Sequence, residues 1–223
     1  MKGLHGFRDE RLAKIARGDT LLGSFVTPKI VVHLVPLSSL GQVVSRDVTR
    51  DAARLQNLLP PIKGMSWGGR YNFDGFLVFA SQTESYVQVF RSGAIEAAAL
   101  PFMGVPEQYK NQIPSVDFEQ TIIVRMDNYL QVQNRLAIPP PIFASIALLQ
   151  VKGYRMSSYA HSDQRGAPID RDNLLLPEIL IEDYGSNVAT LLRPAFDALW
   201  QACGQEKSPN YDDEGNRRLD VGR

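Results

Sequence analysis

Three residues could form a general base and its carboxylate partner: His33, Asp74 and Glu96. His33 lies within an apolar run, and Asp74 and Glu96 lie in later segments that alternate with apolar stretches. An imidazole that is hydrogen-bonded to a carboxylate can remove a proton from water or from a hydroxyl group. These residues therefore define one hypothesis, a hydrolase or nuclease in which His33 is the base. The alternative is that His33 is a core histidine with one satisfied hydrogen bond.

A second set of residues could bind a small molecule or a nucleotide. Arg70, Asn72 and Asp74 alternate with aromatic residues, and alternation along a strand would place these three polar side chains on one face. Arg91, from a neighbouring strand, could complete a ligand-binding rim. The alternative is an ordinary strand start, with Asp74 and Gly75 in a bulge or turn.

The sequence has no motif that predicts a cofactor or a metal. It lacks a Walker-type phosphate loop, a glycine-rich dinucleotide fingerprint and a Gly-x-Ser-x-Gly elbow. Its three histidines are far apart in sequence, so we expect no metal site and no cofactor. The single cysteine, Cys203, lies in an apolar helical pattern, which is typical of a small buried side chain.

The elements that must position these residues follow from periodicity and from proline and glycine signals. Helices are predicted over Phe7–Arg17, Arg46–Leu59 and Ser115 to about Ala137, and a further helix begins at Ser186 and contains Pro194. Strands are predicted over Lys29–Pro36, Tyr71–Ala80, Ser85–Arg91, Ala94–Leu100 and Ile142–Met156, the last as the central strand. Residues 64–69 are expected to be a flexible connector, 157–171 a mobile loop, and 174–183 an edge strand or an extended segment.

These elements predict the α+β class, with a mainly antiparallel sheet of about five strands covered by helices. The chain is expected to be a single α+β domain over residues 1–204, in which residues 1–18 form an N-terminal junction helix. Residues 205–223 are polar and are expected to fray as a C-terminal tail.

Composition excludes several classes of protein. The 24 Lys and Arg residues balance 24 Asp and Glu residues, which argues against a chain that binds nucleic acid on its own. The N-terminal segment is too charged for a secretory signal, and no stretch approaches the roughly 20 apolar residues of a membrane-spanning helix. We therefore expect a cytoplasmic protein that does not contact a membrane.

Several segments together resemble a bacterial protein family. They are Phe7–Ile15, Val31–Leu37, Arg70–Gly75, Tyr86–Arg91 with Ile95 and Glu96, Val151–Met156, Leu174–Asp183, Leu192–Phe196 and Ser208–Tyr211. The order of these segments is similar to the C-terminal region of proteins with an N-terminal Schlafen/AlbA-type DNA-binding domain, often labelled ATP-binding or helix-turn-helix proteins. The resemblance covers nearly the whole chain.

The resemblance implies a role beside a nucleic-acid-binding module. In that family the nucleic-acid-binding half precedes the Phe-Arg-Asp-Glu-Arg helix, and this sequence starts at Met1, just before that helix. We therefore expect that half to be absent, so that nucleic acid would be reached only indirectly through it. The preferred hypothesis is a non-enzymatic accessory or interaction domain, with a protein partner or self-association. The small-molecule or nucleotide-binding domain and the His33 hydrolase or nuclease are the alternatives.

Overall fold

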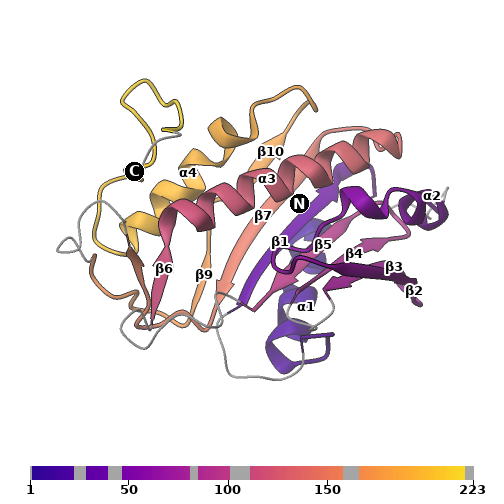
Figure 1. The fold of residues 1–223 in the computed structure, drawn as a ribbon, viewed down its shortest axis with the longest axis horizontal. Helices are drawn as coiled ribbons and strands as arrows, with labels where there is room; N and C mark the ends of the chain where they lie inside the picture. Colours follow the sequence, from indigo (N-terminus) through magenta and orange to yellow (C-terminus); the bar gives the residue numbers. More distant parts are fainter. Residues whose placement is uncertain are drawn as a thin grey trace.

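A computed structural model describes residues 2–22, 29–39, 47–80, 85–100, 111–157 and 166–218 (Figure 1). Among them are four α-helices: α1 (Lys2–Arg17), α2 (Thr49–Arg54), α3 (Ser115–Arg135) and α4 (Val188–Gln201). Two short 3-10 turns, η1 (Leu37–Ser39) and η2 (Gln56–Leu58), accompany them. No helix in these ranges is long and apolar enough to cross a membrane.

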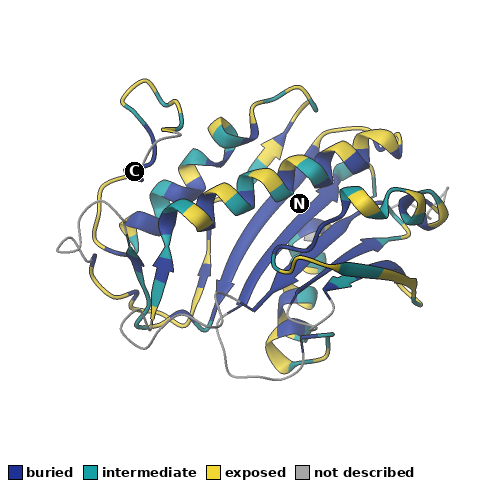
Figure 2. Ribbon diagram, in the orientation of Figure 1, coloured by how far each residue is buried: buried dark blue, intermediate teal, exposed yellow. Residues whose placement is uncertain are grey.

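A large antiparallel sheet organises the described part of the chain. Its strands run in the order β10 (Ile179–Ile181), β7 (Ile142–Leu149), β1 (Lys29–Pro36), β5 (Ile95–Ala99), β4 (Ser85–Phe90), β3 (Gly75–Ala80) and β2 (Trp67–Tyr71). An eighth strand, β9 (Asn173–Leu175), pairs with β7. A separate parallel pair joins β6 (Gln112–Pro114) to β8 (Arg155–Ser157). Strands β1, β5 and β7 are buried along their length and mostly apolar, as expected for strands covered on both faces (Figure 2).

Helices cover both faces of the sheet. Because side chains alternate along a strand, Ile30, Val32 and Leu34 of β1 point to one face and join the main core with α3 and α4. Val31 points to the other face and packs with Leu12 and Ile15 of α1. Figure 1 shows α3 and α4 running side by side across the sheet. The residues of α1 therefore meet a different set of strand side chains from those that meet α3.

The predicted α+β class is confirmed, but the predicted strand count of about five was too low. The segment 174–183, predicted as an edge strand or an extended segment, contains β10, which lies at the edge of the sheet, and most of β9. Strand β2 was not predicted as a strand, and its five residues are too few for a clear period-two pattern. Residues 67–69 of the predicted flexible connector lie in β2, where the glycines pair with β3. Their sequence looks like a loop because glycine is uncommon in strands.

The predicted strand over Ile142–Met156 is really two strands on different sheets. Strand β7 ends at Leu149, and Gln150 and Gly153 then adopt positive φ angles of 59° and 85°. This turn sends β8 to pair with β6. Strand β7 also lies one position from the end of the seven-strand path, so the expectation of a central strand was wrong.

The Ser92-Gly93 pair in the sequence predicts a two-residue loop with positive φ at the glycine. The loop between β4 and β5 has three residues, Arg91–Gly93, because Phe90 lies opposite Ala94 and its N–H bonds to the carbonyl of Ala94 at 2.9 Å. The positive φ of Gly93 is confirmed, and the loop length was one residue too short. Gly93 has a φ of 85°, and an added Cβ would lie 2.4 Å from Cδ1 of Ile138. Only glycine satisfies both conditions at this position. Within the predicted mobile loop, residues 158–165 lie outside the described residues.

The expected C-terminal tail packs on the body over its described part. Ser208, Asn210 and Tyr211 are buried, and the Tyr211 hydroxyl donates a hydrogen bond to the carbonyl of Ala189 in α4 at 2.8 Å. Cys203 is also buried, as predicted, and its Sγ accepts a hydrogen bond from the backbone N–H of Met156 at 3.4 Å. Burial raises the pKa of this thiol. The expectation of a fraying tail was therefore wrong for residues 205–218.

Candidate functional site

A row of polar side chains crosses the sheet on the face that α1 covers. Backbone register places Ser145 of β7 opposite His33 of β1, His33 opposite Glu96 of β5, and Glu96 opposite Gln88 of β4. Since paired residues share a face of the sheet, the four side chains form one line over four strands. All four are buried, and apolar clusters around Leu12 and around Leu4 also lie on this face.

Helix α1 supplies the cation for this row. Arg11 donates from Nε to Oε2 of Glu96 at 2.8 Å, and from Nη2 to Oε1 of Glu96 at 2.8 Å. This two-point geometry is the strong form of an arginine–carboxylate pair. The Arg11 guanidinium also lies 5.2 Å from the ring centroid of Phe90. Helix α1 is thus fastened to the sheet through a charge pair at the centre of the face that it covers.

Two further donors complete the surroundings of Glu96. The hydroxyl of Tyr86 donates to Oε1 at 2.7 Å, and Nε2 of His33 lies 3.0 Å from Oε2. Each carboxylate oxygen therefore has two partners, which uses the four lone-pair sites of the group. The side chain of Glu96 is 0% exposed and that of His33 is 1% exposed.

The electrostatics of Glu96 follow from these contacts. Burial works against the charged form, but the hydrogen bonds and charges of Arg11 and His33 outweigh it and lower the pKa of Glu96 to about 2. The hydrogen bond to Glu96 raises the pKa of Arg11. Burial, together with the Glu96 charge, raises the pKa of Tyr86 well above its ordinary value, so its hydroxyl keeps its proton.

His33 has one ring nitrogen in use and one without a partner. Because ionised Glu96 can only accept, Nε2 of His33 must carry the proton of this hydrogen bond. Its Nδ1 is buried and has no hydrogen-bond partner among the described residues. The ring of Phe7, from α1, packs edge-on against the imidazole at a centroid distance of 5.8 Å. With α1 in place, a substrate has no open route to this imidazole.

The structure brings together two of the three candidate catalytic residues. His33 and Glu96 are direct partners, whereas Asp74 lies in the exposed turn between β2 and β3. The same turn contains Asn72, so the predicted alternation of Arg70, Asn72 and Asp74 along one strand does not exist. The turn arises because Gly75 has a φ of 153° and its N–H bonds to Oδ1 of Asn72 at 2.8 Å.

The candidate ligand-binding residues contact different neighbours. The Arg70 guanidinium lies 5.4 Å from the ring centroid of Phe79, and Nδ2 of Asn72 donates to Gln88 at 2.6 Å. Arg91 pairs with Asp47 and donates from Nε to the carbonyl of Phe73 at 3.2 Å. These contacts stabilise the β2–β3 and β4–β5 turns, and they do not direct the four side chains to a common point.

Sequence reasoning missed Arg11 and Tyr86 as members of the cluster. One signal was available, because Glu96 stands alone in the apolar strand Ile-Glu-Ala-Ala-Ala, and a buried carboxylate needs a cation. The sequence does not say which of the 24 Lys and Arg residues supplies it.

A second buried carboxylate, Glu119 of α3, holds the C-terminal segment. Its Oε1 accepts hydrogen bonds from Nε1 of Trp200 at 3.0 Å and from the hydroxyl of Ser208 at 2.8 Å. Its Oε2 accepts from Nη1 of Arg217 at 3.0 Å. Both buried carboxylates thus connect a terminal segment to the body of the protein. In the described ranges no group of three or more His, Cys, Asp or Glu side chains could hold a metal ion.

No family model matches this chain, and neither a curated protein nor a solved structure matches it.

The buried Glu96 predicts a dependence of stability on pH. Its folded pKa of about 2 lies below its ordinary value of 4.5, so the stabilisation is complete above about pH 5. It is lost as the pH falls towards 2, because the unfolded chain takes up the proton first; the loss is about 3 kcal/mol. Urea unfolding between pH 2.5 and 7 measures the free energy of unfolding of the native chain and of Glu96→Gln. We expect the difference between the two free energies to become smaller as the pH falls. A constant difference over this range would contradict the prediction, and Glu214→Gln, on an exposed turn, serves as the control.

Proposed function

We propose that this chain is a non-enzymatic accessory and interaction domain that works in the bacterial cytoplasm beside a Schlafen/AlbA-type nucleic-acid-binding module. One observation carries the non-enzymatic part. Glu96 accepts four hydrogen bonds and is fully buried, so it has no free lone pair for a substrate proton or a metal. The most chemically capable cluster among the described residues thus serves to hold α1 on the sheet.

The junction role of α1 is supported by how it is attached. Arg11 binds Glu96 at the centre of the sheet, and Arg8 and His5 both pair with Glu178 near its edge. Attachment at two places keeps a helix in one orientation. The exposed side of α1, including Ala13, would then present a defined surface to the partner. The resemblance of Phe7–Ile15 and of the later segments to the family supports the identity of that partner.

The first experiment measures association. The chain, a Schlafen/AlbA-type module and their mixture are run on size-exclusion chromatography with light scattering, which also reports self-association. We expect a complex of the two proteins. Ala13→Arg, on the exposed side of α1, should weaken this complex at least tenfold, whereas Val124→Arg, at an exposed position of α3, should leave it unchanged. A mixture that elutes as two separate species at high concentration would contradict the proposal.

The second candidate function is the hydrolase or nuclease, and the 3.0 Å contact between His33 and Glu96 favours it. This function requires α1 to leave the sheet so that substrate and water reach the imidazole. Nucleoside triphosphates, nucleic acids and nitrophenyl esters are incubated with the purified chain and with His33→Gln. We expect no turnover from either protein. Turnover by the native chain that disappears in His33→Gln would overturn the accessory-domain proposal and establish the enzyme.

A further inference from the structure

Strand β2 lies at one end of the sheet. It is the last strand of the seven-strand path, and among the described residues it pairs with β3 alone. Gly69, Arg70 and Tyr71 are exposed, and Figure 2 shows β2 as a half-buried to exposed ribbon. Its sequence contains neither proline nor lysine, two residues that commonly protect a sheet edge from pairing with another strand. Strand β2 is therefore a candidate for pairing with a further strand.

Hydrogen bonds in the β2–β3 turn show how the backbone of β2 is oriented. The N–H of Asn72 bonds to the carbonyl of Gly75 at 3.0 Å, and the N–H of Gly75 bonds to the carbonyl of Asn72 at 3.3 Å. Such doubly bonded pairs alternate with non-bonded pairs along an antiparallel ladder. Arg70 and Gly68, which are two and four positions before Asn72, therefore also direct their backbone groups towards β3.

The intervening residues direct their backbone groups away from β3. These residues are Trp67, Gly69 and Tyr71, which together carry three N–H donors and three carbonyl acceptors. In the part of the chain that the structure describes, none of these six groups has a hydrogen-bond partner. One edge of β2 thus presents donors and acceptors at every second residue, as a partner strand requires.

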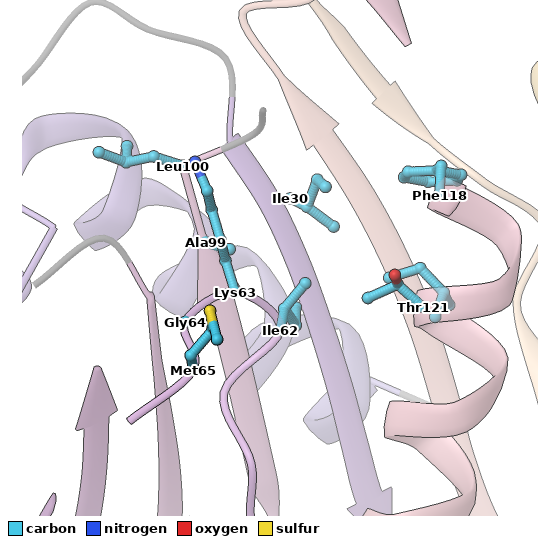
Figure 3. A pocket seen from close by; sticks show the side chains of 10 residues that line it. Ile30, Ile62, Lys63, Gly64, Met65, Ala99, Leu100, Phe118 and Thr121 are labelled. Carbon is cyan, nitrogen blue, oxygen red and sulfur yellow. The ribbon is translucent and has the colours of Figure 1, made fainter. Parts of the chain in front are cut away.

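Large apolar side chains are exposed at the same edge. Six such side chains are exposed in the described ranges, and three of them lie in β2 or within two residues of it: Met65 at 99%, Tyr71 at 59% and Phe73 at 93%. Met65 lies beside Gly64, where the chain leaves the pocket next to α3 and enters β2 (Figure 3). Side chains of this size cover about 150–250 Å² each, so two copies that meet here would bury roughly 1,000 Å², the lower limit of a specific interface.

We propose that two copies of this chain pair through β2, antiparallel and about a two-fold axis, so that their sheets become one. The axis passes beside Gly69, which lies opposite Gly69 of the second copy, and Trp67 lies opposite Tyr71. This is the only two-fold register in which all six outward backbone groups of each copy find partners in the other. It also forms two aromatic cross-strand pairs, which stabilise a sheet.

The other side chains fit this register. Gly68 lies opposite Arg70 of the second copy, so the arginine meets no opposing side chain, and its guanidinium stays over Phe79 of its own chain at 5.4 Å. When the register is continued two residues past each end of β2, Met65 of one copy reaches Phe73 of the other. A thioether and an aromatic ring form a favourable contact. The two most exposed apolar side chains of the described residues would therefore cover each other.

Sedimentation equilibrium of the full chain tests the association. We expect the mass to rise with concentration from 24.9 kDa to twice that value, with a Kd on the order of 10 µM, because the interface is at the small end of specific ones. A mass that stays at 24.9 kDa up to about 500 µM, fifty times the expected Kd, would overturn the proposal. The interface does not include α1, so this result would leave the accessory-domain proposal unaffected.

Two variants at one position test the backbone pairing. Tyr71→Pro removes an outward N–H and leaves the ladder to β3 intact, because the N–H of Tyr71 does not bond to β3. Tyr71→Val keeps the N–H, and both variants lose the ring that packs on Phe76 at 5.3 Å. Each change occurs twice in the dimer, so we expect Tyr71→Pro to weaken dimerisation at least tenfold and Tyr71→Val about threefold. Equal weakening by the two variants would overturn pairing through the backbone.

A disulfide across the interface tests the register and does not depend on a loss of association. Gly68 and Arg70 of opposite copies form a non-hydrogen-bonded pair, with Cα atoms about 4.5 Å apart, which is within the range of a disulfide. An added Cβ at Gly68 meets no atom within 4 Å, and native Cys203 is buried. Gly68→Cys and Arg70→Cys are mixed with oxidised glutathione, which accepts the two electrons and two protons of the thiols. We expect a covalent dimer from the mixture and severalfold less from either variant alone, because identical positions lie diagonally across the axis. Equal yields with and without mixing would overturn the register.

Discussion

Replacement of Arg11 with methionine is expected to lower the free energy of unfolding by about 3–5 kcal/mol, the largest effect that we predict for a single substitution. The variant keeps most of the side-chain volume of Arg11 but leaves the Glu96 carboxylate charged and buried without its cation. Two of the four hydrogen bonds to Glu96 disappear at the same time. Urea unfolding at pH 7, followed by circular dichroism, measures the change.

The matched control for Arg11→Met is Arg17→Met. Arg17 lies on the same helix and pairs with Asp19, but both side chains are exposed, so we expect a change below about 0.5 kcal/mol. Equal destabilisation by the two variants would show that loss of helix propensity, and not loss of the buried pair, is responsible.

A second substitution separates the charge of Glu96 from the packing of Arg11. Glu96→Gln removes the buried charge while keeping a similar shape, so the double variant Arg11→Met, Glu96→Gln should be more stable than Arg11→Met by about 1–3 kcal/mol. A double variant that is less stable than Arg11→Met would contradict the assignment of Glu96 as a buried anion.

Replacement of Arg217 with methionine is expected to destabilise the protein by about 3–4 kcal/mol and to release the C-terminal segment. Arg217 neutralises buried Glu119, and its guanidinium also lies 5.8 Å from the ring centroid of Tyr211. The remaining donors to Glu119, Trp200 and Ser208, are neutral and cannot replace the charge. Limited proteolysis and urea unfolding together measure release and stability.

The neighbouring Arg218→Met is the control for this second prediction. Arg218 is exposed, so its replacement should change the unfolding free energy by less than about 0.5 kcal/mol. The proteolytic cleavage pattern should stay that of the native chain. Cleavage in residues 205–218 of Arg217→Met under native conditions is the expected result. A native cleavage pattern in Arg217→Met would mean that Tyr211 and Ser208 hold the segment without the ion pair.

The elements that the sequence predicted well depend on local physics. Lys29–Pro36 was predicted with its observed bounds, because β-branched residues between two prolines favour a strand whatever the rest of the chain does. The position of the β4–β5 turn was also predictable, since Gly93 supplies the positive φ of a short loop, although the loop has three residues and not the two predicted. The α+β class follows from such elements.

The errors occur where tertiary contacts overrule local signals. Residues 67–69 have the composition of a loop, but pairing with β3 makes them a strand. Residues 205–218 are polar and look like a tail, but Glu119 offers a buried partner to Arg217 and Ser208. In both places the stabilising groups are distant in sequence, so no pattern within the segment records them.

For the candidate site, the sequence by itself determined which side chains are chemically capable: His33 in a buried strand and Glu96 in another. Only the tertiary structure decided that these two meet and that Arg11, 85 residues from Glu96, completes them. The physical reason is that register across β1 and β5 sets the first contact and the docking of α1 sets the second. Arg11 neutralises Glu96 and donates two of its four hydrogen bonds. His33 and Glu96, a pair of residues typical of catalysis, therefore hold helix α1 on the sheet.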